Sequence, residues 1–201
     1  MNQQFTCRMA LPSDCVRNIA KYIHLTDPYI YPQICTDPQD DAWCDFIRQC
    51  LNTPGNVYHL DHIAVLLHSE NIIGAACIVP CGNALTICDG IEIPEGLKQS
   101  IAPVVKGYFV PLIQETQAFS GYNLINLCID SAYRGQGFGK QLLRFCLERC
   151  GNVPIHLDVI ASNAPAICLY EGLGFRITAE YMGFSGSDAK LPCYHMVRKT
   201  Q

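Results

Sequence analysis

The feature that most constrains this chain is a glycine-rich turn between a strand and a helix. Residues 124–129 form an apolar run typical of a buried strand, and residues 138–150 carry apolar side chains at helical spacing. The turn between them contains the sequence Arg134-Gly135-Gln136-Gly137-Phe138-Gly139. Glycines keep side chains away from the unpaired backbone N–H groups at the start of a helix, and such groups attract anions. We therefore expect an anion-binding site in this turn.

Two common phosphate-binding motifs do not fit the turn. The dinucleotide motif G-x-G-x-x-G, counted from Gly135, requires a glycine where Lys140 stands. The P-loop motif G-x-x-x-x-G-K-[ST] requires a glycine at Arg134 and a hydroxyl residue at Gln141. The glycines therefore belong to neither motif.

The turn does match R-x-x-G-x-G/A, and it resembles the pyrophosphate-binding loop of the GCN5-related N-acetyltransferase (GNAT) family. The family's second motif, N-x-x-A-x-x-x-Y-x-x-x-G-F, is matched by Asn163, Ala166, Tyr170 and Gly174-Phe175. Two motifs in this order and at this separation identify the chain as a member of that family. The resemblance covers most of the chain, apart from residues 82–121.

The resemblance implies a fold. We expect a single α/β domain over residues 1–201, with a mixed, mostly antiparallel sheet of about six or seven strands flanked by helices. The sheet would be splayed where an acetyl donor inserts. Residues 82–121 are longer than the family core needs, and we expect a helical insertion there. Residues 194–199 would form the last strand.

The resemblance also implies an activity, which is transfer of an acetyl group from acetyl-CoA to a primary amine by direct attack on the thioester. Tyr170 matches the family's general acid. A phenol with the ordinary pKa near 10 is a weak acid toward a thiolate whose pKa is near 8.5, so part of its role is positional. The donor would contact the strand before the turn, the turn itself and the second motif: Leu127, Cys128, Ile129, Arg134, Gly135, Gln136, Gly137, Phe138, Gly139, Lys140 and Asn163.

The sequence leaves several roles open. The sequence does not identify the general base. By the resemblance it is a carboxylate or a water chain, and the candidate side chains are Asp130, Asp158, Glu92, Glu115, His59 and His156. Tyr170 is alternatively an aromatic residue that packs its helix on the sheet, and Asn163 is alternatively an N-cap, a role compatible with donor binding. Cys128 lies on the donor strand, but free cysteines are too frequent here for its position to indicate a covalent intermediate. A catalytically idle CoA-binding sensor or interaction module is the alternative function.

Charge and composition limit the classes of molecule that the chain is expected to bind. The net charge of −4, from 14 basic and 18 acidic residues, argues against nucleic-acid binding. The longest apolar run, residues 72–79, is much shorter than the roughly 18 residues of a membrane span, and no secretory signal pattern is present, so we expect a cytoplasmic protein that does not bind membranes. The 13 cysteines are odd in number and contain no C-x-x-C pair, which favours free thiols and no metal site. The acceptor would be a small molecule or a peptide amine.

The remaining segments give local expectations. We expect a strand at residues 6–10, a helix capped by Ser13 or Asp14, a second helix at about 40–51 and a hairpin of strands 63–67 and 72–79. Helices near 97–105 and 108–119 would follow. Tyr29, Tyr31 and Trp43 either line an acceptor pocket or pack in the core, and Asp37, Asp40 and Asp41 either attract a cationic amine or begin the second helix. Residues 183–192 would be a mobile loop at the acceptor site.

Overall fold

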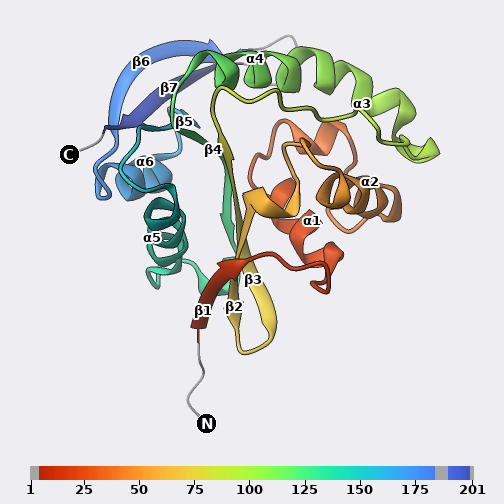
Figure 1. The fold of residues 1–201 in the computed structure, drawn as a ribbon, viewed down its shortest axis with the longest axis horizontal. Coiled ribbons are helices and arrows are strands. Elements are labelled where there is room, and N and C mark those ends of the chain that lie inside the picture. Colours follow the sequence, from red (N-terminus) through yellow and green to blue (C-terminus); the bar gives the residue numbers. More distant parts are fainter. Residues whose placement is uncertain (1–4, 184–189, 200–201) are drawn as a thin grey trace.

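The computed structural model describes residues 5–183 and 190–199, and its centre is a sheet of seven strands in the order β1-β2-β3-β4-β5-β7-β6 (Figure 1). All neighbouring strands are antiparallel except β4 and β5. The mixed, mostly antiparallel sheet is therefore confirmed. The strands are β1 (Phe5–Met9), β2 (Ile63–His68), β3 (Asn71–Pro80), β4 (Tyr122–Ile129), β5 (Ile155–Ile160), β6 (Arg176–Gly183) and β7 (Leu191–Arg198).

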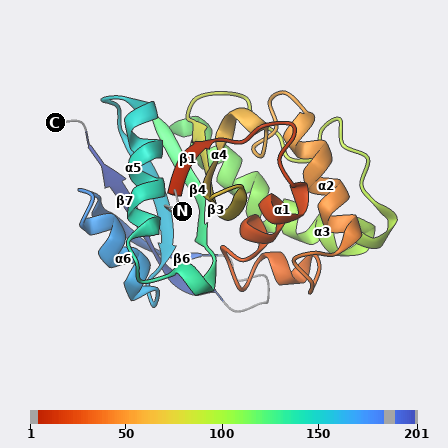
Figure 2. The same cartoon turned by 90° about the horizontal axis from the view of Figure 1, so that it is seen from below.

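Helices cover both faces of the sheet (Figure 2). One face carries α5 and α6, which share a core with alternate residues of β5. The other face carries the N-terminal helices and the segment after β3, with a second core around the fully buried Trp43, Tyr31 and Tyr58. The helices are α1 (Val16–His24), α2 (Asp41–Asn52), α3 (Lys98–Val104), α4 (Val110–Ala118), α5 (Phe138–Cys150) and α6 (Ala164–Glu171).

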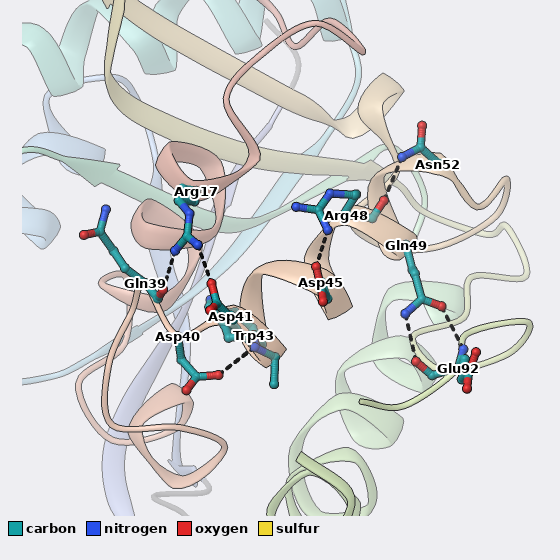
Figure 3. A network of polar contacts seen from close by, with 11 residues as sticks. Arg17, Gln39, Asp40, Asp41, Trp43, Asp45, Arg48, Gln49, Asn52 and Glu92 are labelled. Atoms are coloured by element: carbon teal, nitrogen blue, oxygen red, sulfur yellow. Dashed lines mark hydrogen bonds and ion pairs between the residues drawn. The ribbon is translucent and has the colours of Figure 1, made fainter. Parts of the chain in front are cut away.

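The start of α1 differs from expectation, whereas the start of α2 agrees with it. Cys15 is the N-cap of α1 and makes no side-chain cap, because the Asp14 carboxylate instead accepts hydrogen bonds from Arg8 at 2.6 and 2.7 Å and from the Leu11 amide at 2.8 Å. The prediction that Ser13 or Asp14 caps this helix was wrong. At α2 the Asp40 carboxylate accepts from the amides of Ala42 and Trp43, at 2.9 and 3.1 Å (Figure 3).

The acidic residues near α2 have local partners. Arg17 of α1 pairs with Asp41 and bonds the Gln39 carbonyl, which ties α1 to the start of α2 (Figure 3). Together with the Asp40 cap, this pairing supports the interpretation of Asp40 and Asp41 as a helix start. Tyr31 and Trp43 are fully buried and Tyr29 is exposed, so two of the three aromatic residues pack in the core.

The segment between β3 and β4 is irregular at first, becomes helical at residue 95, and contains an unusual turn. A short 3₁₀ turn, Glu95–Leu97, leads into α3, and a π-helical turn, Val105–Phe109, joins α3 to α4. Pro111 lies in the first turn of α4, and a proline both lacks an N–H and crowds the carbonyl four residues earlier. The carbonyl four residues before Pro111 belongs to Gly107, which lies in the wider π-turn. Turns of this kind are frequent at functional sites.

The contact between β4 and β5 is short. Only three residue pairs join the two strands: Tyr122 with Ile155, Asn123 with His156 and Leu124 with Leu157. Residues 126–129 of β4 pair with β3 and with no residue of β5, so the two strands part beyond Leu124. This divergence is the splay that the sequence predicts.

At the paired end of β4 the chains pack closely. A Cβ on Gly121, whose φ is +93°, would lie 1.9 Å from the Pro154 carbonyl oxygen, so only glycine fits there. The joint between the two strands therefore depends on a residue without a side chain.

Two further findings concern thiols and membranes. All 13 cysteines have free thiols, and Cys15 and Cys168 are the exposed ones. Within residues 5–183 and 190–199, no helix is both long and apolar enough to cross a membrane.

Candidate functional site

The glycine-rich turn follows directly from the end of β4. The Asp130 side chain caps a 3₁₀ turn, Ser131–Tyr133, by accepting from the Ala132 amide at 3.1 Å. The Arg134 Nε then donates to the Ile129 carbonyl oxygen at 3.0 Å, which fixes the turn to the last residue of the strand. Arg134 is exposed, and its guanidinium, which also lies beside the Cys128 thiol, can meet an anion.

The glycines have the conformation and the space that a bound anion needs. Gly135 and Gly137 have φ values of +74° and +86°, which other residues rarely adopt, and nothing lies within 4 Å of a Cβ built on either. Gly139 faces inward instead, where its Cβ would lie 3.5 Å from Leu169 and 3.8 Å from Ile129. The first two glycines therefore open the turn to a ligand, and the third allows α5 to approach β4 and α6.

Backbone donors converge at this turn. The N-cap of α5 is Gly137, which has no side chain to satisfy the first amides of the helix. No hydrogen bond in the described part of the chain uses the amide N–H groups of residues 135–140, a set that includes Gln136, Phe138 and Lys140. Free amides at the positive end of a helix bind phosphate groups well.

The strand that leads to the turn has unpaired backbone on one side. Leu127, Cys128 and Ile129 pair with β3, whereas their other edge faces the part of β5 that has diverged. Such an edge offers backbone N–H and C=O groups to an extended ligand. Burial raises the pKa of the Cys128 thiol above its usual range despite the nearby Arg134, so this cysteine is a poor nucleophile.

Asn126 carries a further unmet hydrogen bond at the divergence. Its Nδ2 donates to the Tyr31 hydroxyl at 2.9 Å, and that hydroxyl lies 2.6 Å from the Tyr58 hydroxyl. The Asn126 Oδ1 is buried and has no partner among the described residues. A buried acceptor without a donor is costly, and a ligand that supplies a donor removes that cost.

Tyr170 lies on the α5–α6 face of the sheet. Its ring packs near Phe175, with centroids 5.8 Å apart, and the residue is only 9% exposed. Burial raises the pKa of the Tyr170 phenol to about 12, so it keeps its proton at neutral pH. Burial is the one cause of that shift, and no hydrogen bond joins the Tyr170 hydroxyl to a residue that the structure describes. Asn163 caps α6, since its side chain accepts from the Ala166 amide at 3.3 Å.

Three of the six base candidates are paired with other groups or lie in other parts of the fold. Asp130 accepts from Lys21 at 2.9 Å and from the Tyr22 hydroxyl at 3.1 Å, and the Lys21 hydrogen bond holds the pKa of this carboxyl below its usual range. Glu92 bonds Gln49 of α2 through its backbone (Figure 3). His59 caps a 3₁₀ turn, Leu60–His62, which precedes β2.

The other three candidates gather on the face of the sheet opposite Tyr170. Leu157 and Val159 point into the core beneath α5 and α6, so the alternate residues His156 and Asp158 point to the opposite face. Glu115 of α4 lies near Asp158, and its pKa is raised first by burial and then by that negative charge.

Two residues that the sequence analysis missed join this group. His195 of β7 stands directly opposite Asp158 in the sheet, and its Nδ1 lies 2.9 Å from Asp158 Oδ1. Tyr181 of β6 lies near the same carboxylate, and its pKa is raised first by burial and then by the negative charge of Asp158. Alternation along β5 indicated that His156 and Asp158 share a face, but the register of β7 against β5 was needed to find His195.

The last two strands border the loop expected at residues 183–192. The loop expected at 183–192 lies largely outside the described residues, although Gly183 ends β6 and Leu191 and Pro192 belong to β7. β7 therefore begins three residues before the predicted last strand. Over the described ranges, no group of three or more His, Cys, Asp or Glu side chains could hold a metal ion.

Comparison with known proteins gives consistent matches. A family model described as "Acetyltransferase (GNAT) domain" matches residues 59–177. The L-amino acid N-acetyltransferase AaaT of Escherichia coli K12 is 33% identical over 111 residues, which cover 51% of this chain and 68% of that protein. The ribosomal protein bS18-alanine N-acetyltransferase of the same strain is 47% identical over 56 residues, or 26% of this chain and 38% of the relative.

The matched segments are short for some relatives and complete for the solved structures. An uncharacterised Mycobacterium leprae protein, 38% identical over 73 residues, is covered over only 20% of its length. An N-acetyltransferase from Staphylococcus aureus Mu50 superposes with a TM-score of 0.73 at 22% identity, covering 96% of this chain and 99% of that chain. A Salmonella typhimurium acetyltransferase, solved with acetyl-CoA, gives a TM-score of 0.55 at 19% identity, covering 98% and 95%.

Proposed function

The chain belongs to the GNAT acetyltransferase family, and we propose on that premise that it transfers an acetyl group from acetyl-CoA to a primary amine. The observation that carries the proposal is that the open glycine-rich turn follows directly on the strand edge of β4 that has no strand partner. The turn at residues 135–140 has free amides and open glycines, and β4 runs from that turn with one edge unpaired. Enzymes of this family use acetyl-CoA, a ligand with a diphosphate, an extended amide-containing arm and a thioester.

The residues present fit that donor. We expect the amides of residues 135–140 and the Arg134 guanidinium to bind the diphosphate, because both are oriented donors at a helix N-terminus. The free edge of Leu127, Cys128 and Ile129 would bind the amides of the arm. Asn163 lies at the start of α6, beside the diverged part of β5. Acetyl-CoA would supply the activated acetyl group, and these residues of the chain would bind and orient it.

Tyr170 is the group we assign to the leaving sulfur. Its hydroxyl is protonated and bonds none of the described residues, so it can donate to the sulfur as the carbon–sulfur bond breaks. Because its pKa of about 12 exceeds that of a thiol near 8.5, full proton transfer is uphill, and the hydrogen bond itself supplies much of the stabilisation.

Asp158 is the base we favour. It accepts the proton that the amine nitrogen loses as the new carbon–nitrogen bond forms. The Asp158 side chain is 23% exposed, on the face of the sheet opposite Tyr170, in the strand that borders the divergence. Tyr170 would then donate to the leaving sulfur from one face of the sheet, and Asp158 would take the proton of the attacking amine on the other face. Asp130 is already paired with Lys21, and Glu92 and His59 lie in other parts of the fold.

The acceptor is proposed as a small-molecule or peptide amine. By their names, matched relatives act on L-amino acids and on the alanine of a ribosomal protein. In the π-turn of this chain, burial holds the pKa of the Tyr108 phenol well above its usual range, and the negative charges of Asp27 and Asp158 add to that effect. Carboxylates and aromatic rings of this kind favour a cationic amine.

An acceptor screen tests the proposal. Acetyl-CoA is incubated with the protein and a panel of L-amino acids, polyamines and peptides with free N-termini, and release of the CoA thiol is followed. Release that requires both protein and one class of amine is the expected result. Binding of acetyl-CoA without release on any member of a broad panel would favour the idle sensor or interaction module instead.

A further inference from the structure

The hydrogen bonds around His195 form a chain that the acetyl-transfer chemistry described so far does not use. His195 Nδ1 lies 2.9 Å from Asp158 Oδ1, and its Nε2 lies 3.3 Å from Nδ1 of His156. The other ring nitrogen of His156, Nε2, lies 3.2 Å from the Ser120 carbonyl oxygen. Four groups from β5, β7 and the segment before β4 are therefore linked in one line.

The chemistry of the two ends decides where the protons are. A carbonyl oxygen only accepts, so His156 Nε2 carries a hydrogen and donates it to Ser120. His156 is neutral, because burial and the neighbouring His195 both lower its pKa, and its Nδ1 is then an acceptor. His195 Nε2 must therefore donate to it. A carboxylate also only accepts, so His195 Nδ1 donates to Asp158. His195 carries both hydrogens and is an imidazolium.

Packing holds this arrangement in place. The Phe119 ring stacks on His156 with centroids 4.4 Å apart and an interplanar angle of 3°, and it lies 5.1 Å from His195. The side chain of His195 is only 16% exposed. Neither imidazole can rotate freely. The Ser120 carbonyl therefore fixes the tautomer of His156, and His156 in turn fixes the direction of the hydrogen bonds that His195 donates.

We propose that His195 is a positioning residue for acetyl transfer, which, as an imidazolium held by His156 and the Ser120 carbonyl, fixes one oxygen of the Asp158 carboxylate so that the other faces the acceptor amine. The inference rests on the proposed function, in which Asp158 accepts a proton from the acceptor amine. His195 itself does not touch the amine in this arrangement, because both of its ring nitrogens are occupied.

The groups around His195 set its titration. Asp158 and His156 face it from β5, and Glu115 and Phe119 face it from α4 and its C-terminal end. Tyr181 of β6 reaches the group through Asp158. The hydrogen bond with Asp158 raises the pKa of His195 above its usual 6.5, and Glu115 adds to that effect. The positioning is therefore present while His195 is protonated and is lost as the pH rises through the raised pKa.

The test is the pH profile of kcat/KM for acetyl transfer, measured from pH 6 to 10 for the wild type and for His195→Gln. In the wild type we expect a decline on the alkaline side as His195 loses its proton. His195→Gln keeps a neutral donor toward Asp158 but cannot titrate, so we expect about a tenfold lower kcat at neutral pH, an unchanged KM for acetyl-CoA and no such alkaline decline.

A second variant guards against misfolding of the first. His156→Phe keeps the stack on Phe119 and removes the acceptor for His195 Nε2, so we expect the alkaline decline to move to lower pH. His62→Gln, at a partly buried histidine whose Nδ1 lies 3.1 Å from the Val57 carbonyl oxygen, is the matched control and should keep the wild-type profile. Far-ultraviolet circular dichroism and the acetyl-CoA-induced thermal shift establish folding and donor binding for each variant.

The outcomes separate the two proposals. A wild type that binds acetyl-CoA but transfers acetyl to no amine at any pH overturns the proposed function and this role with it. An active wild type whose alkaline decline persists unchanged in folded His195→Gln and His156→Phe overturns the role of His195 alone. Loss of the decline in one and its displacement in the other supports the role.

Discussion

At the scale of single residues, the turn that we propose as the diphosphate site depends on glycines at positions where a side chain would fill the space of the ligand. Gly137 has a φ of +86° and open space where a side chain would begin. We expect Gly137→Asp to abolish acetyl-CoA binding, because it places a negative carboxylate among the amides that would bind the diphosphate. Isothermal titration calorimetry measures the affinity.

Gly151 provides the matched control for that substitution. It ends α5 with a φ of +68° and, like Gly137, has nothing within 4 Å of a Cβ. Gly151→Asp imposes comparable backbone strain at the far end of the same helix, so it should retain donor affinity while losing stability. Normal affinity in Gly137→Asp would show that the turn does not bind the donor.

Tyr170 gives a second test at this scale. Tyr170→Phe removes a hydroxyl that bonds no described residue, so we expect the free energy of unfolding to change little. We expect kcat to fall by about a hundredfold with little change in the KM for acetyl-CoA, because the lost donor acts on the leaving sulfur. Steady-state kinetics at saturating amine measures both constants, and equal turnover in the variant would remove Tyr170 from the acid role.

At the scale of secondary-structure elements, α2 shows how much one cap contributes. The Asp40 carboxylate satisfies two amides at the start of α2. We expect Asp40→Ala to lower the free energy of unfolding by about 1 kcal/mol, as N-cap removal typically does. Urea unfolding measures the change. Asp45→Ala, which removes only the exposed pair with Arg48 on the same helix, should cost less than about 0.5 kcal/mol. Equal losses would mean that Asp40 acts through charge and not as a cap.

The elements also show which parts of the fold can be predicted from sequence. Helical periodicity and turn residues located α2, α5 and the β2–β3 hairpin, because those signals are local. The α1 cap was misplaced because Asp14 has a stronger partner in Arg8, eight residues before α1 starts. His195 could not be assigned to the site, since its contact with Asp158 depends on pairing between strands 37 residues apart.

At the scale of the whole molecule, donor binding should stabilise the fold. At acetyl-CoA concentrations about a hundredfold above the dissociation constant, binding adds about 2.7 kcal/mol, which raises the unfolding midpoint by roughly 5 to 11 °C in a domain of this size. CoA should act similarly, and NAD should not, because the turn lacks the dinucleotide motif. Differential scanning fluorimetry measures the shift, and no shift with either CoA compound would mean that the turn does not bind this donor.

The short contact between β4 and β5 has a mechanical consequence. The sheet consists of a four-stranded plate, β1 to β4, and a three-stranded plate, β5, β7 and β6, and three residue pairs hinge them together. A ligand bound along the free edge of β4, as we propose for acetyl-CoA, would contact both plates where they have no backbone pairing. We therefore expect donor binding to reduce the motion of one plate relative to the other.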